Sequence, residues 1–240
     1  MPGFFEILRW IHIAAGFIGL AAFWIPVFTR KGGVNHRLYG KVFKYCAYVV
    51  LAAAAGSITI RVPMALADGI TPITHPESFA FLAFLGYLTL VTFVGMRHGF
   101  QVLGFKGSLE KMNTPLNRLL AMSSIVASML IIAFALYYGP SNKILLYALS
   151  PIGFLGGFGI LKVISQPQSD KRMWFYEHMG SILGTGIAFH TAFAVFGASR
   201  LFDLGLSGFA AVIPWITPTL IGIPAIFLWT RHYRKKFATV

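Results

Sequence analysis

Apolar runs without charged residues recur along the chain, and short polar clusters separate them. Each run is close to the ~20 residues that a helix needs to cross the hydrocarbon core of a membrane. No segment alternates polar and apolar residues with the ~10-residue rhythm of a membrane β-barrel, so the pattern predicts helices. We therefore expect an all-α, polytopic integral membrane protein with seven transmembrane helices. The helices are predicted at Trp10–Thr29, Tyr45–Ile60, Ser78–Met96, Leu119–Asn142, Ile144–Leu161, Met179–Ser199 and Leu204–Thr230.

The segments between the runs are short. The second run is the shortest, but Val42 and Phe43 extend it, and Lys44 can reach the headgroups with its long side chain. The connection between the second and third runs, Arg61–Glu77, is the longest on its side of the membrane and contains three prolines. We expect an ordered cap or re-entrant turn there. No shift in composition marks a second domain, so residues 1–240 are predicted to form one helical bundle.

Overall composition agrees with a membrane protein. Hydrophobic residues make up 57% of the chain, charged residues 11%, and the mean hydropathy is +0.72. A soluble core of this size could not hide so much apolar surface. The single cysteine, Cys46, excludes an internal disulfide and a cysteine-rich metal site.

The positive charges indicate the orientation of the helices. The chain has 20 Lys and Arg residues, and all but four follow the first, third, fifth or seventh run. Because cationic loops stay in the cytoplasm during insertion, the N-terminus is predicted outside the cell and the C-terminus on the cytoplasmic side of the membrane. The net charge of +13 then indicates attraction to anionic lipid headgroups rather than to nucleic acid. The four exceptions are Arg9, Arg61, Lys143 and Arg200.

Small residues predict where helices pack closely, because short side chains let two backbones approach in lipid. Proline interrupts the regular hydrogen bonding of a helix, and three prolines are therefore expected to kink the last run. The prolines are Pro214, Pro218 and Pro224, and the glycines are Gly16, Gly19, Gly153, Gly156, Gly157, Gly159, Gly180 and Gly184.

Histidines are the main candidates for chemistry, since no Asp, Glu, Lys or Arg lies deep inside a run. This absence disfavours proton pumps and charge-coupled transporters, which usually hold charged residues at mid-membrane. Two histidines, His12 and His190, lie inside runs in the outer half. Counted from the nearest arginine at ~1.5 Å per residue, their depths are ~4 and ~15 Å, which strains them as a pair of ligands for one haem. Both are nevertheless predicted as further cofactor-binding candidates.

Four other histidines lie at the inner edges of runs: His36, His98, His178 and His232. A neutral imidazole binds haem iron, zinc or copper, and a haem with two axial histidines needs both at one depth. We predict His36 and His178 as a metal or haem pair, with His98 as a further candidate. Glu177 and Trp174 are close enough along the helix to orient the imidazole of His178. His98 and His232, which stand beside arginines, can equally bind carbonyls or lipid phosphates.

Two stretches resemble a known family. "HIAAGFIGLAAFWIPVFTRKGGVNHRLYGKVF" (12–43) has an early histidine, a KG turn and an HRxxG start to the second run, while "WFYEHMGSILGTGIAFHTAF" (174–193) has matching tryptophan, histidine and TAF elements. Both resemble an uncharacterised family of bacterial membrane proteins, the domain of unknown function twenty-three-oh-six, and the proline-rich last run is similar too. The resemblance implies a shared role for His12, His36 and His178, with His190 an addition of this chain. It implies no activity.

Two classes of function remain open. The chain can be a redox or metal-handling membrane protein that holds haem b or a transition metal through histidines and exchanges electrons with quinone. Alternatively, it can be a cofactor-free accessory, assembly or scaffold subunit of a respiratory or photosynthetic complex, in contact with partner subunits or pigments. No motif for a nucleophilic triad or nucleotide binding occurs, so no enzyme class is predicted.

Overall fold

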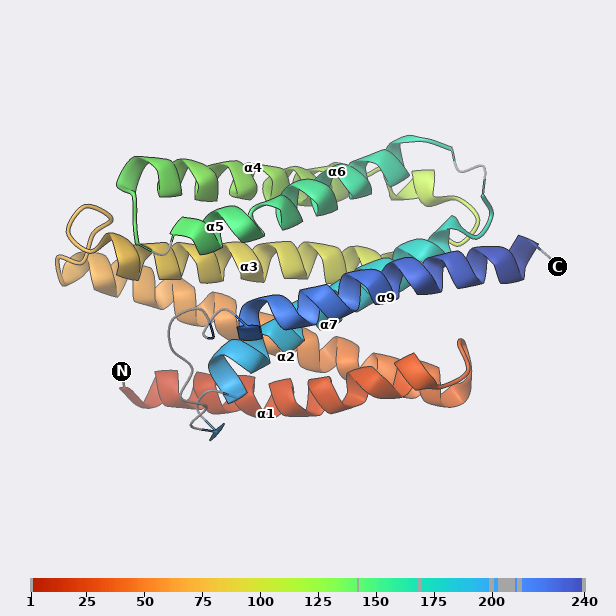
Figure 1. Cartoon of the computed structure of the whole chain (residues 1–240), viewed down its shortest axis with the longest axis horizontal. Coiled ribbons are helices and arrows are strands. Elements are labelled where there is room, and N and C mark those ends of the chain that lie inside the picture. Colours follow the sequence, from red (N-terminus) through yellow and green to blue (C-terminus); the bar gives the residue numbers. More distant parts are fainter. Residues whose placement is uncertain are drawn as a thin grey trace. The chain divides into compact units, whose positions relative to one another are not determined.

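The computed structural model describes residues 2–141, 143–167, 170–198, 201–202, 210 and 213–238. The long elements of this part are all helices, which confirms the all-α prediction. They are α1 (Pro2–Phe28), α2 (Val34–Ala67), α3 (Pro76–Gln101), α4 (Pro115–Tyr138), α5 (Lys143–Leu149), α6 (Pro151–Ser165), α7 (Met173–Ala192) and α9 (Ile213–Ala238), labelled in Figure 1. Short helical turns complete the set: η1 (Val102–Gly104), η2 (Leu109–Met112) and the π-helical η3 (Phe193–Ala198).

Seven helical segments of the described chain are long and apolar enough to cross a membrane, as the apolar runs predict. Each overlaps one predicted run. The first part of the last run, from Leu204, lies largely outside the described residues, and α9 is described from Ile213. The segments are Gly3–Phe28, Val34–Ala67, Pro76–Gly104, Pro115–Tyr138, Lys143–Ser165, Met173–Ala198 and Ile213–Ala238.

The connection predicted at Arg61–Glu77 is wrong in its first part, because α2 continues through Arg61 and Pro63 to Ala67. A charged residue ends an uncharged run without ending the helix. The guanidinium carbon of Arg61 lies 5.5 Å from the ring centroid of Phe5, which gives the cation an aromatic partner. The ordered turn that remains is short, and the backbone N–H of Thr71 donates to the Thr74 hydroxyl at 2.9 Å within it.

The chain divides into two compact units. The first comprises Met1–Val94 and Glu110–Pro167, and the second comprises Gly95–Leu109 and Gln168–Val240. The organisation of residues 1–240 as one bundle stays a prediction.

Helices α1 and α2 form an antiparallel hairpin in the first unit (Figure 1). Gly19 permits the close approach, since a Cβ atom at this position would lie 3.2 Å from the Cβ of Cys46. Gly32 closes the turn between the helices with a φ of +74°, a conformation that favours glycine. In the same turn, the Lys31 ammonium donates to the carbonyls of Pro26 and Val27, at 2.9 and 2.7 Å. Burial lowers the pKa of this ammonium.

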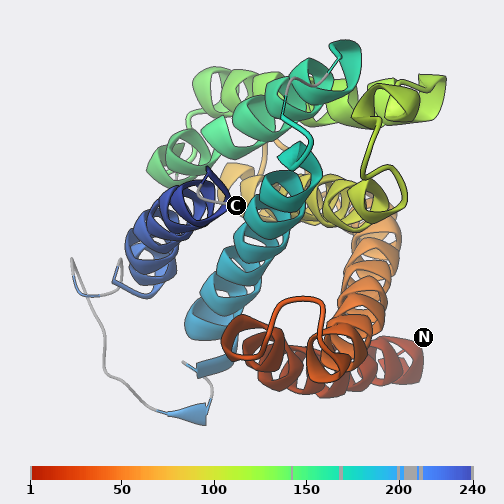
Figure 2. The same ribbon diagram turned by 90° about the vertical axis from the view of Figure 1, so that its right-hand side faces the viewer.

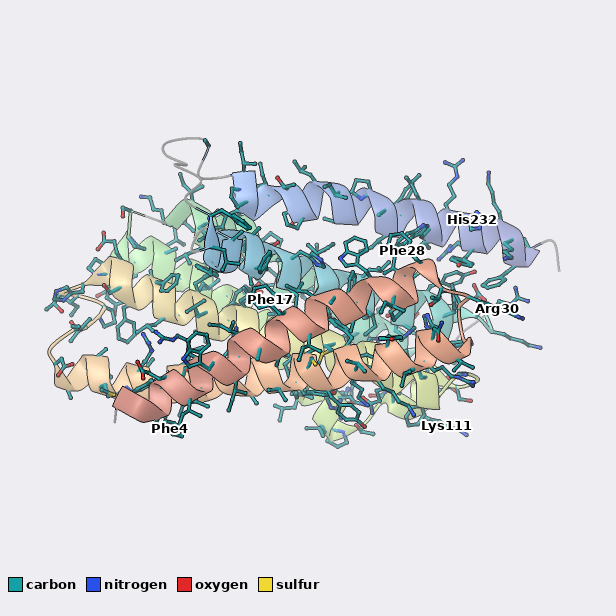
Figure 3. All side chains as sticks on the ribbon, turned by 90° about the horizontal axis from the view of Figure 1, so that it is seen from below. Phe4, Phe17, Phe28, Arg30, Lys111 and His232 are labelled. Atoms are coloured by element: carbon teal, nitrogen blue, oxygen red, sulfur yellow. The ribbon has the colours of Figure 1, made fainter. Side chains whose placement is uncertain are left out.

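The outer surface of the hairpin carries large apolar side chains, as expected of helices that face lipid. Figure 3 labels Phe4, Phe17 and Phe28 at intervals along α1, with Arg30 in the turn that follows. The side chain of Phe28 is 79% exposed, so this aromatic residue at the helix end contributes little to the core of the unit.

The fifth long apolar segment, Lys143–Ser165, is discontinuous, because α5 ends at Leu149 and Pro151 begins α6 after a single intervening residue. A break inside a span leaves backbone groups that need partners in a medium without water. Tyr87 on α3 supplies them. Its hydroxyl lies 3.0 Å from the carbonyl oxygens of both Leu149 and Ser150, to which it can donate, and accepts from the N–H of Gly153 at 2.9 Å.

We expect Tyr87→Phe to destabilise the first unit, because it removes the hydroxyl group to which the buried backbone groups at the break are hydrogen-bonded. The cost of such an unsatisfied group is ~1–3 kcal/mol. Thermal unfolding in detergent measures the effect. Tyr137→Phe is the matched control, since the side chain of Tyr137 is 83% exposed. Equal melting temperatures for the two variants would contradict the role assigned to Tyr87.

In the second unit, α7 and α9 lie side by side (Figures 1 and 2). An aromatic cluster joins them near the start of α7 and the end of α9. The ring of Phe175 lies 4.9 Å from that of Tyr233 and 5.3 Å from that of Phe237, both in edge contacts. These contacts bring the basic end of α9 next to the first turn of α7.

Candidate functional site

The candidate site lies in the second unit, where the end of α3 meets the start of α7. His98 is in the last turn of α3 and its side chain is 4% exposed. Its Nε2–H donates to a carboxylate oxygen of Glu177 at 3.1 Å. The side chain of Glu177 is partly exposed, at 25%, so the pair connects the buried imidazole of His98 to the surface of the described structure.

His178, the next residue along α7, makes a second bond between the same two segments. Its Nδ1 lies 2.7 Å from the carbonyl oxygen of Gly99, and its ring lies 5.9 Å from that of Phe100. Successive residues of a helix point ~100° apart, which lets Glu177 and His178 reach two neighbouring residues of α3. The result is a reciprocal clasp, in which His98 bonds to Glu177 and His178 bonds to Gly99.

Glycine at position 99 makes the clasp possible. A Cβ atom at Gly99 would lie 2.7 Å from the Cβ of Ser181, closer than real Cβ atoms approach, so any larger residue would push α3 and α7 apart. The absence of a side chain also leaves the Gly99 carbonyl open to the imidazole. A backbone carbonyl is present at every residue, so its role as an acceptor cannot be recognised from the sequence. The only hint in the sequence is the small residue beside His98, which allows a close approach.

Two expectations about orientation are corrected by these contacts. Glu177 bonds to His98 rather than to its neighbour His178, and His178 is oriented by a backbone carbonyl. Trp174 holds a different partner, because the Lys106 ammonium lies 4.7 Å from the centroid of its ring. The prediction that Glu177 orients His178 is therefore wrong, because it considers only neighbours on α7. His98 on the facing helix α3 is the hydrogen-bond partner of the Glu177 carboxylate.

Four histidines share one hydrogen-bonding pattern. In each, Nδ1 contacts a backbone carbonyl oxygen, which can only accept, so Nδ1 carries a proton, and in the neutral form of such a ring the lone pair is on Nε2. Histidines that bind metal or haem iron usually donate their other ring N–H in this way. The pairs are His12 with Val50 at 3.1 Å, His36 with Pro26 at 3.1 Å, His178 with Gly99 at 2.7 Å and His190 with Gly186 at 2.7 Å.

The structure distributes the predicted site residues over both units. His98 and His178 are brought together by the clasp. His12 and His36 belong to the first unit and His178 and His190 to the second, so a shared site of His36 and His178 stays a prediction. Among the described residues, no group of three or more His, Cys, Asp or Glu side chains forms a metal-binding cluster.

Two further histidine expectations concern the outer residues and the tail. The predicted depth of His12 depends on Arg9, but α1 begins seven residues before that arginine, at Pro2, and Arg9 pairs with Glu6 at 3.7 Å on an exposed surface. Arg9 is therefore no marker of the helix end. His232 lies near the end of α9 (Figure 3), exposed, with its ring 5.3 Å from that of Tyr233.

No family model, curated protein or solved structure matches the chain. Membership of the family that the two quoted stretches resemble stays a prediction.

Proposed function

We propose that the chain is a multi-pass protein of the bacterial cytoplasmic membrane that holds a haem or a transition metal through histidines and takes part in electron transfer. The observation that carries the proposal is the shared pattern of His12, His36, His178 and His190, each with Nδ1 bonded to a backbone carbonyl. In the neutral form of each ring this contact favours one tautomer, and histidines that bind a metal commonly donate one ring N–H in this way while the other nitrogen is the ligand.

The cofactor that we propose is a haem of the b type, because its iron takes only one or two axial ligands from the protein. His178 and His36 are the proposed ligands. When bound, the haem would supply one-electron chemistry, for which a membrane quinone is a fitting partner. His98 differs from these histidines, because its Nε2 carries the proton and donates to Glu177. We therefore assign His98 to positioning the first turns of α7.

The test of this proposal is haem extraction and elemental analysis of the full chain purified from haem-replete bacteria. We expect haem, or a transition metal, close to one equivalent per chain. A stoichiometric partner protein without any cofactor would instead identify an accessory subunit.

One observation favours that alternative. At Gly156 and Gly159 of α6, an added Cβ atom would meet no atom of a neighbouring element within 4 Å, so small residues face outward from the helix. A second membrane protein could pack closely against them. Copurification of one partner at equal stoichiometry, lost in Gly156→Leu, would support the accessory role.

Orientation is the second part of the proposal. The distribution of Lys and Arg supports an external N-terminus and a cytoplasmic C-terminus. A reporter enzyme that is active only in the cytoplasm should therefore be active when it is fused after Val240. A tag placed before Met1 should be cleaved by protease added outside the cell. The reverse pattern would contradict the orientation and the assignment of His36, His98 and His178 to the inner side.

A further inference from the structure

A basic pocket lies in the second unit, between the segment that precedes α7 and the end of α9. Its volume is about 340 Å³. Three cations line it together with one carboxylate and apolar or aromatic side chains. The lining residues are Asp170, Lys171, Arg172, Tyr176, Arg234, Phe237 and Ala238.

Aromatic rings hold the two arginines in place. The guanidinium carbon of Arg172 lies 4.1 Å from the ring centroid of Phe237, and its Nη1 donates to the Phe237 carbonyl at 3.3 Å. The guanidinium carbon of Arg234 lies 5.0 Å from the ring centroid of Tyr176, which is buried. Stacking on a ring occupies the face of a guanidinium and leaves N–H donors at its edge, so both groups are partly preorganised for an acceptor.

The charges of the lining do not cancel. The carboxylate of Asp170 accepts the backbone N–H of Arg172 at 2.8 Å and is the only acidic group among the lining residues, against three cations. An arginine fork matches two oxygens of a phosphate at once, and two forks with a lysine suit a phosphate group better than a single carboxylate.

The position of the pocket points to the source of such a phosphate. The pocket lies at the ends of two segments that are apolar enough to span a membrane, Met173–Ala198 and Ile213–Ala238. Basic pockets between spanning helices at the level of the headgroups are typical sites for anionic lipids. Phe237 and Ala238 add apolar surface beside the cations.

We propose that this pocket binds the phosphate group of an anionic phospholipid through Arg172, Arg234 and Lys171. The site is independent of the proposed cofactor, and it assigns to defined residues an interaction that the net charge predicts only for the surface as a whole. A soluble phosphate would use the same donors, and the experiment separates the two sources.

The test is native mass spectrometry of the purified full chain in neutral detergent, titrated with phosphatidylglycerol, with phosphatidylcholine and with inorganic phosphate. Phosphatidylglycerol should bind at least ~10-fold more tightly than phosphatidylcholine, and the double variant Arg172→Gln/Arg234→Gln should lose this preference. The control Arg231→Gln/Lys235→Gln removes the same charge from outside the pocket and should retain it. Binding of inorganic phosphate without lipid preference would overturn the lipid as the ligand and assign the site to a soluble phosphate.

A third variant keeps the test valid if loss of the arginines disturbs packing on Phe237. Ala238→Glu leaves both arginines in place and adds a carboxylate to the pocket, so it should also abolish the preference for phosphatidylglycerol without lowering the melting temperature. The proposal is overturned if phosphatidylglycerol and inorganic phosphate both fail to bind preferentially, or if the pocket variants and the control lose binding equally.

Discussion

Gly153→Leu should destabilise the protein strongly, while Gly156→Leu, three residues away on the same helix, should leave its stability nearly unchanged. A Cβ atom at Gly153 would lie 2.5 Å from the Ser124 carbonyl oxygen and in contact with the Ser128 hydroxyl, both on α4. Because a backbone atom is the obstacle, α6 must move away from α4. Overpacking of this kind costs ~1–3 kcal/mol, and we expect the upper end of this range.

The two glycines are a matched pair, since both substitutions add the same apolar side chain to α6. At Gly156 no atom of a neighbouring element lies within 4 Å of the added Cβ. Thermal unfolding of both variants in one detergent measures the difference. Similar melting temperatures would contradict the packing of α6 on α4, and would also weaken the account of the Tyr87 hydroxyl, which lies 3.1 Å from the Cβ position at Gly153.

The second large effect is expected in the visible spectrum. His178→Ala should abolish or shift the Soret band, because His178 is the proposed ligand that the Gly99 carbonyl holds in its tautomer. His232→Ala should leave the band unchanged, since His232 is exposed in the basic end of α9.

Loss of colour in His178→Ala must be separated from loss of folding, because the substitution also breaks the bond to Gly99. Circular dichroism and the melting temperature of the same preparation make this separation. A folded His178→Ala protein with the absorption of the unmodified chain would remove His178 from the ligand set.

The sequence predicts the number and positions of the long apolar helices of the described chain well, because the length and apolarity of a run can both be read directly from the residues. It fails at details that depend on the backbone. Arg61 looks like the end of a helix, yet α2 passes through it and reaches Ala67. The break at Pro151 is satisfied by Tyr87, a residue far away in the chain whose hydroxyl carries no local pattern.

Glycine shows the same division between general pattern and specific contact. The small residues of the fifth span predict close packing, and Gly153 and Gly157 do approach α4. The GxxxG pair Gly180 and Gly184, which looks equally suited, has no neighbouring atom within 4 Å of either Cβ position in the described structure. Spacing identifies a face that can pack, but the partner helix depends on tertiary structure.

The candidate site follows a similar course. Histidines at the ends of apolar runs can be found from the sequence, and so can the carboxylate beside His178. The partner of that carboxylate could not be predicted, because His98 competes for Glu177 from another helix. The basic pocket could not be predicted for the same reason, since Arg172 and Arg234 are far apart in sequence and meet only when α7 packs on α9.

The most direct test of the central claim is a reduced-minus-oxidised difference spectrum of the unmodified full chain, purified from haem-replete bacteria. A b-type haem held by histidines should give a Soret band that shifts on reduction, with about one haem per chain. A colourless preparation that contains neither haem nor a transition metal would contradict a histidine-bound redox centre.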